Sequence, residues 1–506
     1  MTMLKWVQVV IFLVLLGLAG WVSFIFLEGR LIGTVSAFII VSAILIVFTI
    51  FIENRNPSQT LNWILIFAVF PVIGFFFYLL FGRNYKKKKR FEEKKEADEK
   101  AFHMYEVSRV FNDEQLKQMG DHQKMFFRLA QRLGNSPISF NTNTRVLTNG
   151  AEKFPAMISA LKDAKHHIHL EYYIVRNDDI GREIKDILID KAKKGVEVRF
   201  LYDAVGSWIV PDSYWDEMKD AGVHVQAFAP VRLPIIGSRI NYRNHRKIVV
   251  IDGKIGFMGG LNIGDEYLGK VKSYGKWRDT HLYVRGESVR SLQLIFLRDW
   301  QYETGEHLLE QDYLSPEILD HKNIQGGVQM IAGGPDNKWE TIKKLYFAMI
   351  SSAKKKIWIA SPYFIPDDDV LTAMKVASLS GLDVRLVVPS KPDKRIVFHA
   401  SRSYYEELLE TGIRIFEYNK GFMHSKVVLV DDELASIGTS NMDMRSFHLN
   451  FEVNAFLFKT ESINKLREDF ENDFVDSDEL IEEEFNKRSI FVRVTESLFR
   501  LLSPLL

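Results

Sequence analysis

The stretch that decides the fold is His245-Arg246-Lys247-Ile248-Val249-Val250-Ile251-Asp252, because it occurs twice. The second copy is His424-Ser425-Lys426-Val427-Val428-Leu429-Val430-Asp431. In each copy a histidine and a lysine stand two positions apart on a β-branched run, and alternation along a strand would place both on one face. The aspartate comes seven residues after the histidine, at a turn, and Asp252-Gly253 is a strong hairpin signal.

The same residues follow each copy of this motif. The first is followed by Gly259-Gly260-Leu261-Asn262 and the second by Gly438-Thr439-Ser440-Asn441, so an asparagine falls ten residues after the aspartate both times. A single His-x-Lys-x4-Asp match is a weak signal, because it arises by chance in a chain of this length. Two matches with the same downstream residues are a strong one.

A wider repeat encloses the two motifs. Residues 164–170 match 353–359, Tyr172-Tyr173-Ile174 aligns with Tyr363-Phe364-Ile365, 195–201 match 381–387, and 222–225 match 412–415. Each half alternates short β-branched runs with helical stretches, which is typical of α/β layers around a sheet. We therefore predict two similar α/β sandwich domains, at residues 141–315 and 325–488, that form one shared active site. The first half has a longer segment before its histidine, containing Leu233-Pro234-Ile235-Ile236-Gly237, which is either a lipid-facing lip or a longer loop.

The duplicated motif suits chemistry on a phosphodiester. One neutral imidazole can attack phosphorus and form a covalent intermediate. The other can donate a proton to the leaving oxygen and later deprotonate the acceptor hydroxyl. Lys247 and Lys426 would hold the nonbridging oxygens, and the amides of Asn262 and Asn441 would add donors. We expect no metal or cofactor, since the sequence has no His-Glu-x-x-His helix or carboxylate cluster.

A nucleophilic histidine usually needs a carboxylate on its other ring nitrogen, which sets the tautomer. Two candidates follow the motifs at the edges of apolar segments. They are Asp279, in Trp277-Arg278-Asp279-Thr280-His281, and Glu452, in Asn450-Phe451-Glu452-Val453-Asn454. The alternative for each is an ordinary strand residue at the surface.

The N-terminal 82 residues predict membrane helices. Residues 6–27, 31–52 and 61–81 carry no charged side chain, and each is long enough to cross a bilayer as a helix. Basic residues cluster after the third run, so the remainder of the chain should be cytoplasmic; they are Arg83, Lys86, Lys87, Lys88, Lys89 and Arg90. Residues 83–140 read as a basic, mixed-charge helical linker. We therefore expect a multi-pass protein of the cell membrane, with the number of full spans left open by the short connection between the first two runs.

Composition narrows the choice of partners. A net charge of +1 over 506 residues argues against a general polyanion binder, so we expect no nucleic-acid partner. The chain has no cysteine, which excludes disulfides and thiolate metal sites. Residues 489–506 place apolar side chains at helical spacing, which predicts an amphipathic helix that either packs on the catalytic body or lies in the membrane interface.

With these residues in hand, the chain resembles the phospholipase D superfamily, whose signature is a duplicated His-x-Lys-x4-Asp motif. Within it, the chain is similar to the bacterial cardiolipin synthases, through Asn262-Ile263-Gly264-Asp265-Glu266-Tyr267, Trp277-Arg278-Asp279-Thr280-His281 and Gly438-Thr439-Ser440-Asn441-Met442-Asp443. The resemblance covers about residues 140 to 490.

The resemblance implies that two phosphatidylglycerol molecules are joined into cardiolipin with release of glycerol. It also implies a phosphohistidine intermediate and no cofactor, with phosphatidylglycerol and anionic membrane lipids as partners. It favours His245 as the nucleophile and His424 as the acid/base, with Asp279 and Glu452 orienting the histidines and Asp252 and Asp431 included in the catalytic set. Many relatives have Gly-Ser after the aspartate, where this chain has Gly259-Gly260 and Gly438-Thr439.

Three other functions remain as alternatives. The same site could hydrolyse phospholipid if water outcompetes the alcohol. A nuclease would use the same phosphodiester chemistry but needs an extended basic groove with stacking aromatics. A scaffold that only retains the fold should show decayed motifs, whereas both motifs are intact. The oligomeric state and the selectivity among acceptor lipids have no signature in the sequence.

Overall fold

The computed structural model describes residues 40–44, 47–48, 61, 63–67, 119–230, 241–309, 312–319, 324–337 and 339–506. Most of the predicted membrane segments, most of the linker 83–140 and the segment around Leu233–Gly237 lie outside these residues. Within the described residues, no helix has the length and apolar character needed to span a bilayer. The chain divides into two compact units, residues 1–87 with 232–241 and residues 88–231 with 242–506. Both copies of the duplicated motif belong to the second unit.

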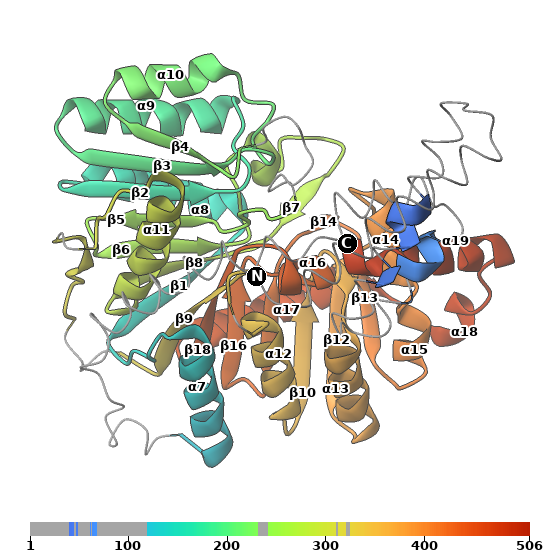
Figure 1. The fold of residues 1–506 in the computed structure, drawn as a ribbon. Coiled ribbons are helices and arrows are strands. Elements are labelled where there is room, and N and C mark those ends of the chain that lie inside the picture. The colour runs from blue at the N-terminus through green and yellow to red at the C-terminus, as the bar shows by residue number, and fades with distance from the viewer. Residues whose placement is uncertain are drawn as a thin grey trace, which may run out of the picture. The chain divides into compact units, whose positions relative to one another are not determined.

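The first half of this unit is built on a seven-stranded mixed sheet. Its strands, in spatial order, are β1 (Thr142–Thr148), β8 (Thr280–Gly286), β6 (Ile255–Gly259), β5 (Ile248–Ile251), β2 (His167–Tyr172), β3 (Glu197–Asp203) and β4 (His224–Phe228). The three strands β2, β3 and β4 are parallel, and the others pair antiparallel. Its main helices are α8 (Asn149–Asp163), α9 (Asp179–Lys193), α10 (Asp212–Asp220) and α11 (Ser288–Thr304). In Figure 1 this half runs from teal at β1 and α8 through green to the olive-yellow of α11.

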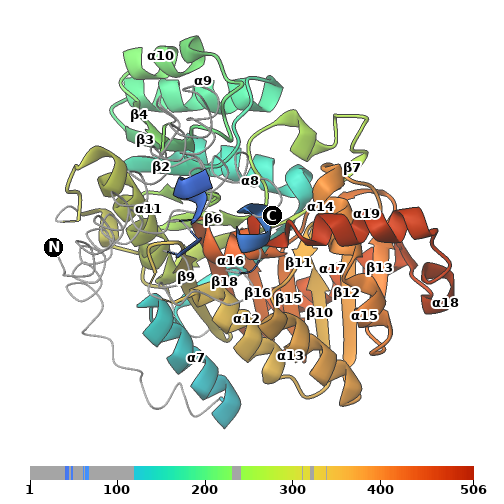
Figure 2. The same cartoon turned by 45° about the vertical axis from the view of Figure 1, so that its right-hand side comes forward.

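The second half repeats this order and adds one strand. Its sheet runs β9 (Gly327–Gly333), β18 (Glu452–Phe458), β16 (Leu434–Gly438), β15 (Val427–Val430), β10 (Lys356–Ala360), β12 (Asp383–Pro389), β13 (Arg414–Tyr418) and β19 (Ser477–Glu479). Its main helices are α12 (Thr341–Ser351), α13 (Asp368–Leu379), α14 (Arg395–Arg402), α15 (Tyr405–Leu409) and α17 (Ser462–Val475). Helix α7 (Asp121–Gly134) packs beside α12, and α18 (Glu482–Phe485) and α19 (Ile490–Arg500) close the chain (Figure 2).

Strand register supports most of the predicted repeat and corrects one segment. Ile168 pairs with Ile251 in the first sheet, and Ile357 pairs with Val430 at the equivalent place in the second. The aligned tyrosines are not equivalent, however. Val175 bridges Ile263 and Phe364 pairs with Met442, so Tyr363 takes the place of Ile174 and not of Tyr172. The sequence alignment was shifted by two residues there because both segments begin with an aromatic residue.

The two sheets share one apolar core. Ile248 and Val250 of β5 pack in the same buried cluster as Val427 and Leu429 of β15. The alternate residues of each strand point the other way, into the core beneath the helices of their own half. Strands apolar on both faces are expected when a sheet is covered on both sides. Each fully buried side chain of this kind contributes about 1.5–3 kcal/mol, so the contact between the halves is a large part of the fold's stability.

Candidate active site

Both histidines lie just before an antiparallel strand, at the edge of the sheet where its parallel strands end. His245 precedes β5, and its backbone N–H donates to the carbonyl of Phe451 at 2.9 Å. His424 precedes β15, and its N–H donates to the carbonyl of Arg278 at 2.7 Å. The short strand β14 (Gly421–Met423) also pairs with β7 (Lys276–Arg278) of the first half. Each histidine loop is therefore held by backbone bonds from the other half.

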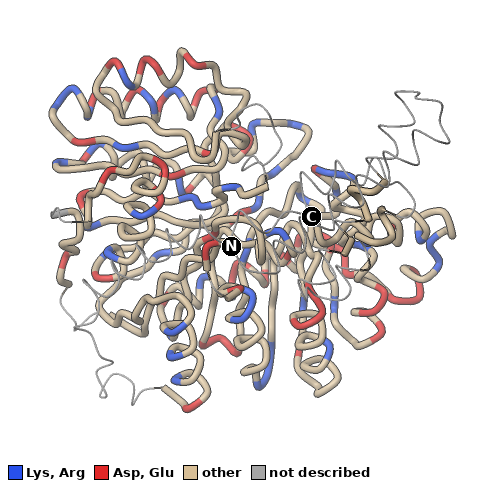
Figure 3. Tube along the Cα trace, in the orientation of Figure 1, with Lys and Arg blue, Asp and Glu red and all other residues tan. Residues whose placement is uncertain are grey.

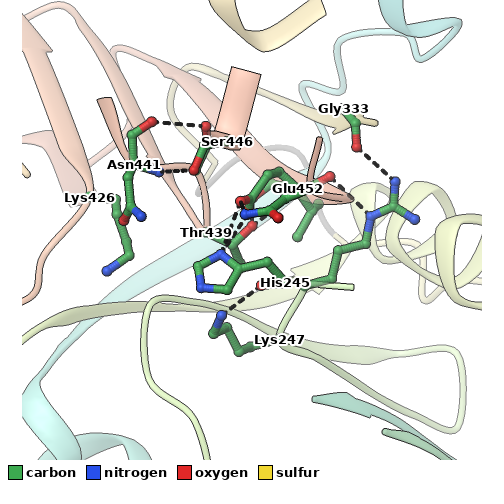
Figure 4. A network of polar contacts seen from close by, with 12 residues as sticks. His245, Lys247, Gly333, Lys426, Thr439, Asn441, Ser446 and Glu452 are labelled. Carbon is green, nitrogen blue, oxygen red and sulfur yellow. Dashed lines mark hydrogen bonds and ion pairs between the residues drawn. The ribbon is translucent and has the colours of Figure 1, made fainter. Parts of the chain in front are cut away.

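The orienting carboxylates are exchanged between the halves. His245 Nδ1 lies 3.0 Å from both carboxylate oxygens of Glu452 in the second half. His424 Nδ1 lies 2.6 Å from Oδ2 of Asp279 in the first half. Figure 4 shows the first of these pairs. A carboxylate that accepts from Nδ1–H holds the tautomer in which Nε2 carries the free lone pair. Each half therefore completes the histidine of the other, which the order of the motifs along the chain does not reveal.

Burial and charge keep both imidazoles neutral near pH 7. Burial is the largest cause and lowers the pKa of His245 to about 4, with Glu452 opposing the shift. Burial also lowers the pKa of His424 to about 3, aided by Lys426. The side chain of each histidine is nevertheless about 11% exposed, whereas both carboxylates are fully buried. The reactive nitrogens are thus reachable, and the supporting acids are shielded from water.

The carboxylates are ionised despite their burial. Burial by itself raises the pKa of Glu452, but His245 and Lys247 outweigh it and leave the pKa below its usual value. Lys426 and His424 do the same for the pKa of Asp279. An ionised acid beside each neutral imidazole stabilises the imidazolium or the N-phosphorylated ring that forms during reaction.

The two lysines connect the histidine sets electrostatically. Lys247 Nζ donates to the carbonyl of its own His245 at 2.6 Å, and Lys426 Nζ lies 2.9 Å from His424 Nδ1. Burial lowers the pKa of Lys247 to about 7 and that of Lys426 to about 8. Lys426 also lowers the pKa of His245, and Lys247 lowers that of His424, so each charge acts on the opposite histidine. The electrostatic influence between the two motifs is therefore mutual.

The asparagines brace the loops and do not contact the histidines. Asn262 accepts from the backbone N–H of Ile174 at 3.0 Å and donates to the hydroxyl of Tyr267 at 3.1 Å. Asn441 donates to Asp443 at 3.0 Å, and its side-chain oxygen is buried without a partner. Figure 4 places Asn441 beside Lys426. Both amides are therefore engaged in loop contacts, apart from the unpartnered oxygen of Asn441.

Asp252 and Asp431 lie at the far ends of β5 and β15 and not beside the histidines. Asp252 accepts backbone N–H bonds from residues 165–167 at 2.7–3.2 Å, and Asp431 accepts three from residues 354–356 at 2.8–2.9 Å. A strand rises about 3.3 Å per residue, so seven positions separate each aspartate from its histidine by roughly 20 Å. The catalytic role expected for these two residues is thus corrected to a positioning one. Each fixes the turn before β2 or β10 from a left-handed hairpin position.

We predict that Asp252→Ala lowers stability and leaves the chemistry of the folded enzyme intact. Losing the carboxylate leaves backbone donors without their partner, at a cost of about 1–2 kcal/mol. Thermal unfolding should show a lower Tm, while kcat of the folded fraction stays within about twofold of wild type. Asp190→Ala, which removes an exposed partner of Lys194 on α9, is the matched control. A loss of kcat on the scale of a histidine variant, at unchanged Tm, would return Asp252 to the catalytic set.

Three further residues complete the site. The ring of Tyr173 lies 5.0 Å from that of His245, and the ring of Trp277 lies 5.1 Å from that of His424. Arg246, between the motif's histidine and lysine, donates to the carbonyls of Glu452 at 3.0 Å and of Gly333 at 3.1 Å. It joins the His245 loop to two strands of the other half. Tyr173 and Trp277 stood in segments singled out from the sequence, but their contacts depend on the packing of the two halves.

The closeness of Asp279 explains why Gly260 stands where many relatives have serine. A Cβ on Gly260 would lie 2.0 Å from Oδ1 of Asp279, so a side chain there would displace the carboxylate. Its counterpart Thr439 has room, and its hydroxyl helps to lower the pKa of Glu452. Asp279 thus requires a glycine beside it, whereas Glu452 has a threonine at the equivalent position.

We predict that Gly260→Ser, which restores the residue common in relatives, lowers kcat by at least about 10²-fold. The reason is that a shift of about 1 Å in a positioning group is enough to cost this much. Steady-state phosphatidyl transfer measures the effect. Gly305→Asn is the control, because that left-handed glycine has open space around its Cβ. Wild-type activity in Gly260→Ser would mean that Asp279 can move without harm.

In the part of the chain that the structure describes, no three His, Cys, Asp or Glu side chains group to hold a metal ion. The fold and this site, with two α/β halves and one His–Lys set from each, define a protein of the phospholipase D type. A family described as "Cardiolipin synthase, PLD-like domain" matches residues 157–300 and 346–474, and one described as "Phospholipase_D-nuclease N-terminal" matches residues 37–83. The chain belongs to the cardiolipin synthase family.

Individual relatives agree with this assignment. The chain is 61% identical to a cardiolipin synthase of Alkalihalophilus pseudofirmus over 99% of both chains. It is 62% identical to cardiolipin synthase 2 of Bacillus anthracis, over 92% of this chain and 90% of that one. Among solved structures, a phosphatidylserine synthase of Haemophilus influenzae covers 76% of this chain with a TM-score of 0.56 and 15% identity. That last likeness shows the fold.

Proposed function

We propose that this phosphatidyltransferase makes cardiolipin by moving a phosphatidyl group from one phosphatidylglycerol to another through a phosphohistidine. The observation that carries the proposal is the pair of neutral imidazoles, each with an ionised carboxylate on Nδ1. Relatives that match the chain over nearly its whole length are named for this product. The acceptor and donor are then the same lipid, and glycerol is the second product.

In the first half-reaction, Nε2 of His245 attacks the phosphorus of the donor. The N–P bond forms as the P–O bond to the glycerol headgroup breaks, and protonated His424 gives its proton to the leaving oxygen. A bound phosphodiester anion favours the imidazolium form of His424, which raises its pKa from the low value set by burial. Lys247 and Lys426 neutralise the nonbridging oxygens as charge builds up.

In the second half-reaction, neutral His424 removes the proton from the terminal hydroxyl of a second phosphatidylglycerol. The resulting oxygen attacks phosphorus, the new O–P bond forms, and the N–P bond to His245 breaks. Glu452 holds the ring of His245 throughout, so the nucleophile returns to its starting orientation. Protons and bonds balance over the two steps, and the chain's own residues supply every group that the proposal uses.

We place the remaining parts of the chain around this centre. Residues 6–27, 31–52 and 61–81 are proposed as membrane-spanning helices, and 83–140 as the linker that leads to catalytic domains at 141–315 and 325–488 on the cytoplasmic side. This topology concentrates both lipid substrates at the surface where the enzyme works. It rests on the absence of charge in these runs and on the basic residues that follow them.

The direct test is to supply the purified full-length protein with phosphatidylglycerol and identify the products by mass spectrometry. Cardiolipin and glycerol in equal amounts are expected. Phosphatidic acid without cardiolipin would mean that the site hydrolyses its donor. Nucleotide release from DNA would favour a nuclease, against which stands the mixture of acidic and basic residues along both halves (Figure 3).

The pH dependence of kcat, which reports the enzyme–lipid complex, should follow the lysines and the nucleophile, because the bound phosphodiester keeps His424 protonated there. Lys247 loses its proton as pH rises through about 7, and the neutral amine no longer stabilises the charge on the phosphodiester. His245 gains a proton as pH falls through about 4, which removes the lone pair of the nucleophile. We therefore expect kcat to be highest between these values and to decline above pH 7. In Lys247→Arg, whose guanidinium stays charged, the decline should move toward about 8, the pKa of Lys426. A constant kcat up to pH 9 would contradict this account.

A further inference from the structure

Helix α19 packs on the catalytic body through its charged side. Glu496 is almost fully buried and lies 3.2 Å from Arg488 and 3.5 Å from Arg402 of α14. Arg500 pairs with Glu407 at 2.6 Å and lies over the ring of Tyr404. These contacts anchor the helix to α14 and α15. The charged side of an amphipathic surface helix normally faces water, so α19 is attached the opposite way round.

The apolar side of α19 is therefore left exposed. Five apolar side chains of α19 and its C-terminal cap are more than half exposed, whereas Val492 is less exposed and Phe499 packs against the core; the five are Ile490, Phe491, Val494, Leu498 and Leu501. Their spacing places them along one face of the helix. Contiguous exposed apolar surface of this kind marks an interaction site. The ion pairs on the other side prevent the helix from rolling over to bury it.

Exposed basic residues stand at the start of the helix on which α19 packs. Lys391, Lys394 and Arg395 are exposed at the start of α14, on which α19 packs. Among the residues that the structure describes, none of the three makes an ion pair, and Lys394 Nζ lies 5.7 Å from the centre of the Tyr363 ring. An apolar helix face beside exposed lysine and arginine side chains is complementary to an anionic phospholipid surface, with acyl chains below and phosphates above.

The same segment borders the active site. Asp393, between the exposed lysines, accepts a hydrogen bond from the hydroxyl of Tyr363, and its charge raises the pKa of Lys426. The equivalent segment of the first half, after β3, exposes Trp208 and Ile209. The neighbouring Ser207 donates to the carbonyl of Tyr173 at 3.1 Å, and the ring of Tyr173 faces His245. Exposed apolar or basic side chains are thus connected to both motifs through short chains of contacts.

We propose that α19, the basic start of α14 and the Trp208 turn form the face by which the catalytic unit lies on an anionic phospholipid bilayer. The lipid nature of the occupant rests on the proposed function, because a donor that stays in the bilayer must reach histidines whose neighbouring segments carry these exposed side chains. The face acts in addition to the N-terminal segments. They keep the chain at the membrane, and this face sets the orientation of the active site toward the lipid.

The test uses the full-length protein, which has no cysteine of its own. Single cysteines at Phe491→Cys and Leu498→Cys carry an environment-sensitive fluorophore, and the protein is reconstituted into vesicles of phosphatidylglycerol and phosphatidylcholine. Ser380→Cys is the matched control, since Ser380 is exposed at the opposite edge of the sheet, before β12. The readout is quenching by lipids with a quencher on the acyl chain, and it requires no enzymatic turnover.

At least twofold quenching at positions 491 and 498, and none at 380, is expected in vesicles rich in phosphatidylglycerol. Replacing Lys391, Lys394 and Arg395 together by glutamate should reduce the quenching by more than half. A blue-shifted but unquenched probe would show that protein, either residues 1–82 or a second copy, covers the face, and it would overturn the proposal. A probe that is neither shifted nor quenched would mean that the face stays in water, and it would also overturn the proposal. Quenching does not depend on turnover, so this experiment tests the membrane face even if the protein does not make cardiolipin. The product assay described above tests the proposed reaction by itself.

Discussion

Alanine at either His245 or His424 is expected to lower cardiolipin formation by at least about 10⁴-fold, because each removes a group that makes or breaks bonds to phosphorus or a proton. The protein should stay folded, since the backbone bonds of both loops remain. His307→Ala is the control, because His307 is an exposed histidine outside the site. Full activity in either active-site variant would refute the two-histidine scheme.

The same variants can identify the nucleophile. Because p-nitrophenol leaves without needing a proton, His424→Ala should still release a burst of p-nitrophenol from a phosphatidyl p-nitrophenyl ester and retain the phosphatidyl group on His245. His245→Ala should show neither. This direction follows the assignment that the family resemblance implies, with His245 as the nucleophile. A burst from His245→Ala and none from His424→Ala would exchange the two roles.

Glu452→Gln and Asp279→Asn are each expected to lower kcat by about 10³-fold or more, through the histidine of the other half. The amide retains the shape but can no longer stabilise an imidazolium. Because Glu452 raises the pKa of His245, the substitution should lower that pKa further below about 4. Histidine resonances followed by NMR against pH would report this shift, which a merely structural role of Glu452 would not produce.

A double-mutant cycle tests whether the carboxylates are truly exchanged. The cycle is measured on the free energy of unfolding, because activity is already lost in each histidine variant. The changes for Glu452→Gln with His245→Ala, and for Asp279→Asn with His424→Ala, should be non-additive. The changes for Glu452→Gln with His424→Ala, and for Asp279→Asn with His245→Ala, should add. Glu317→Gln, which removes an exposed partner of Arg285, serves as the control. Coupling of Glu452 to His424 in place of His245 would contradict the geometry.

Local spacing along the chain was sufficient for the repeat, for the α/β class and for the choice of the histidines, lysines and acids. Asp252-Gly253 predicted a hairpin, and both Asp252 and Gly253 have the left-handed backbone that such a turn requires. The resemblance to the cardiolipin synthases is confirmed by family matches and close relatives. These features depend on alternation and turn preference, which act over a few residues.

Which residues meet across the two halves was decided only by tertiary packing. Glu452 serves His245 from 207 positions away, and Asp279 serves His424 from 145. Asp252 and Asp431 belong to the same motifs as the histidines but lie at the opposite ends of β5 and β15, because an extended strand separates its two ends. Helix α19 shows the same division: its amphipathic pattern was visible in the sequence, whereas the side that faces the protein was set by Glu406, Glu407 and Arg402 on distant elements. Periodicity defines the faces of an element, and only the assembled fold determines what each face contacts.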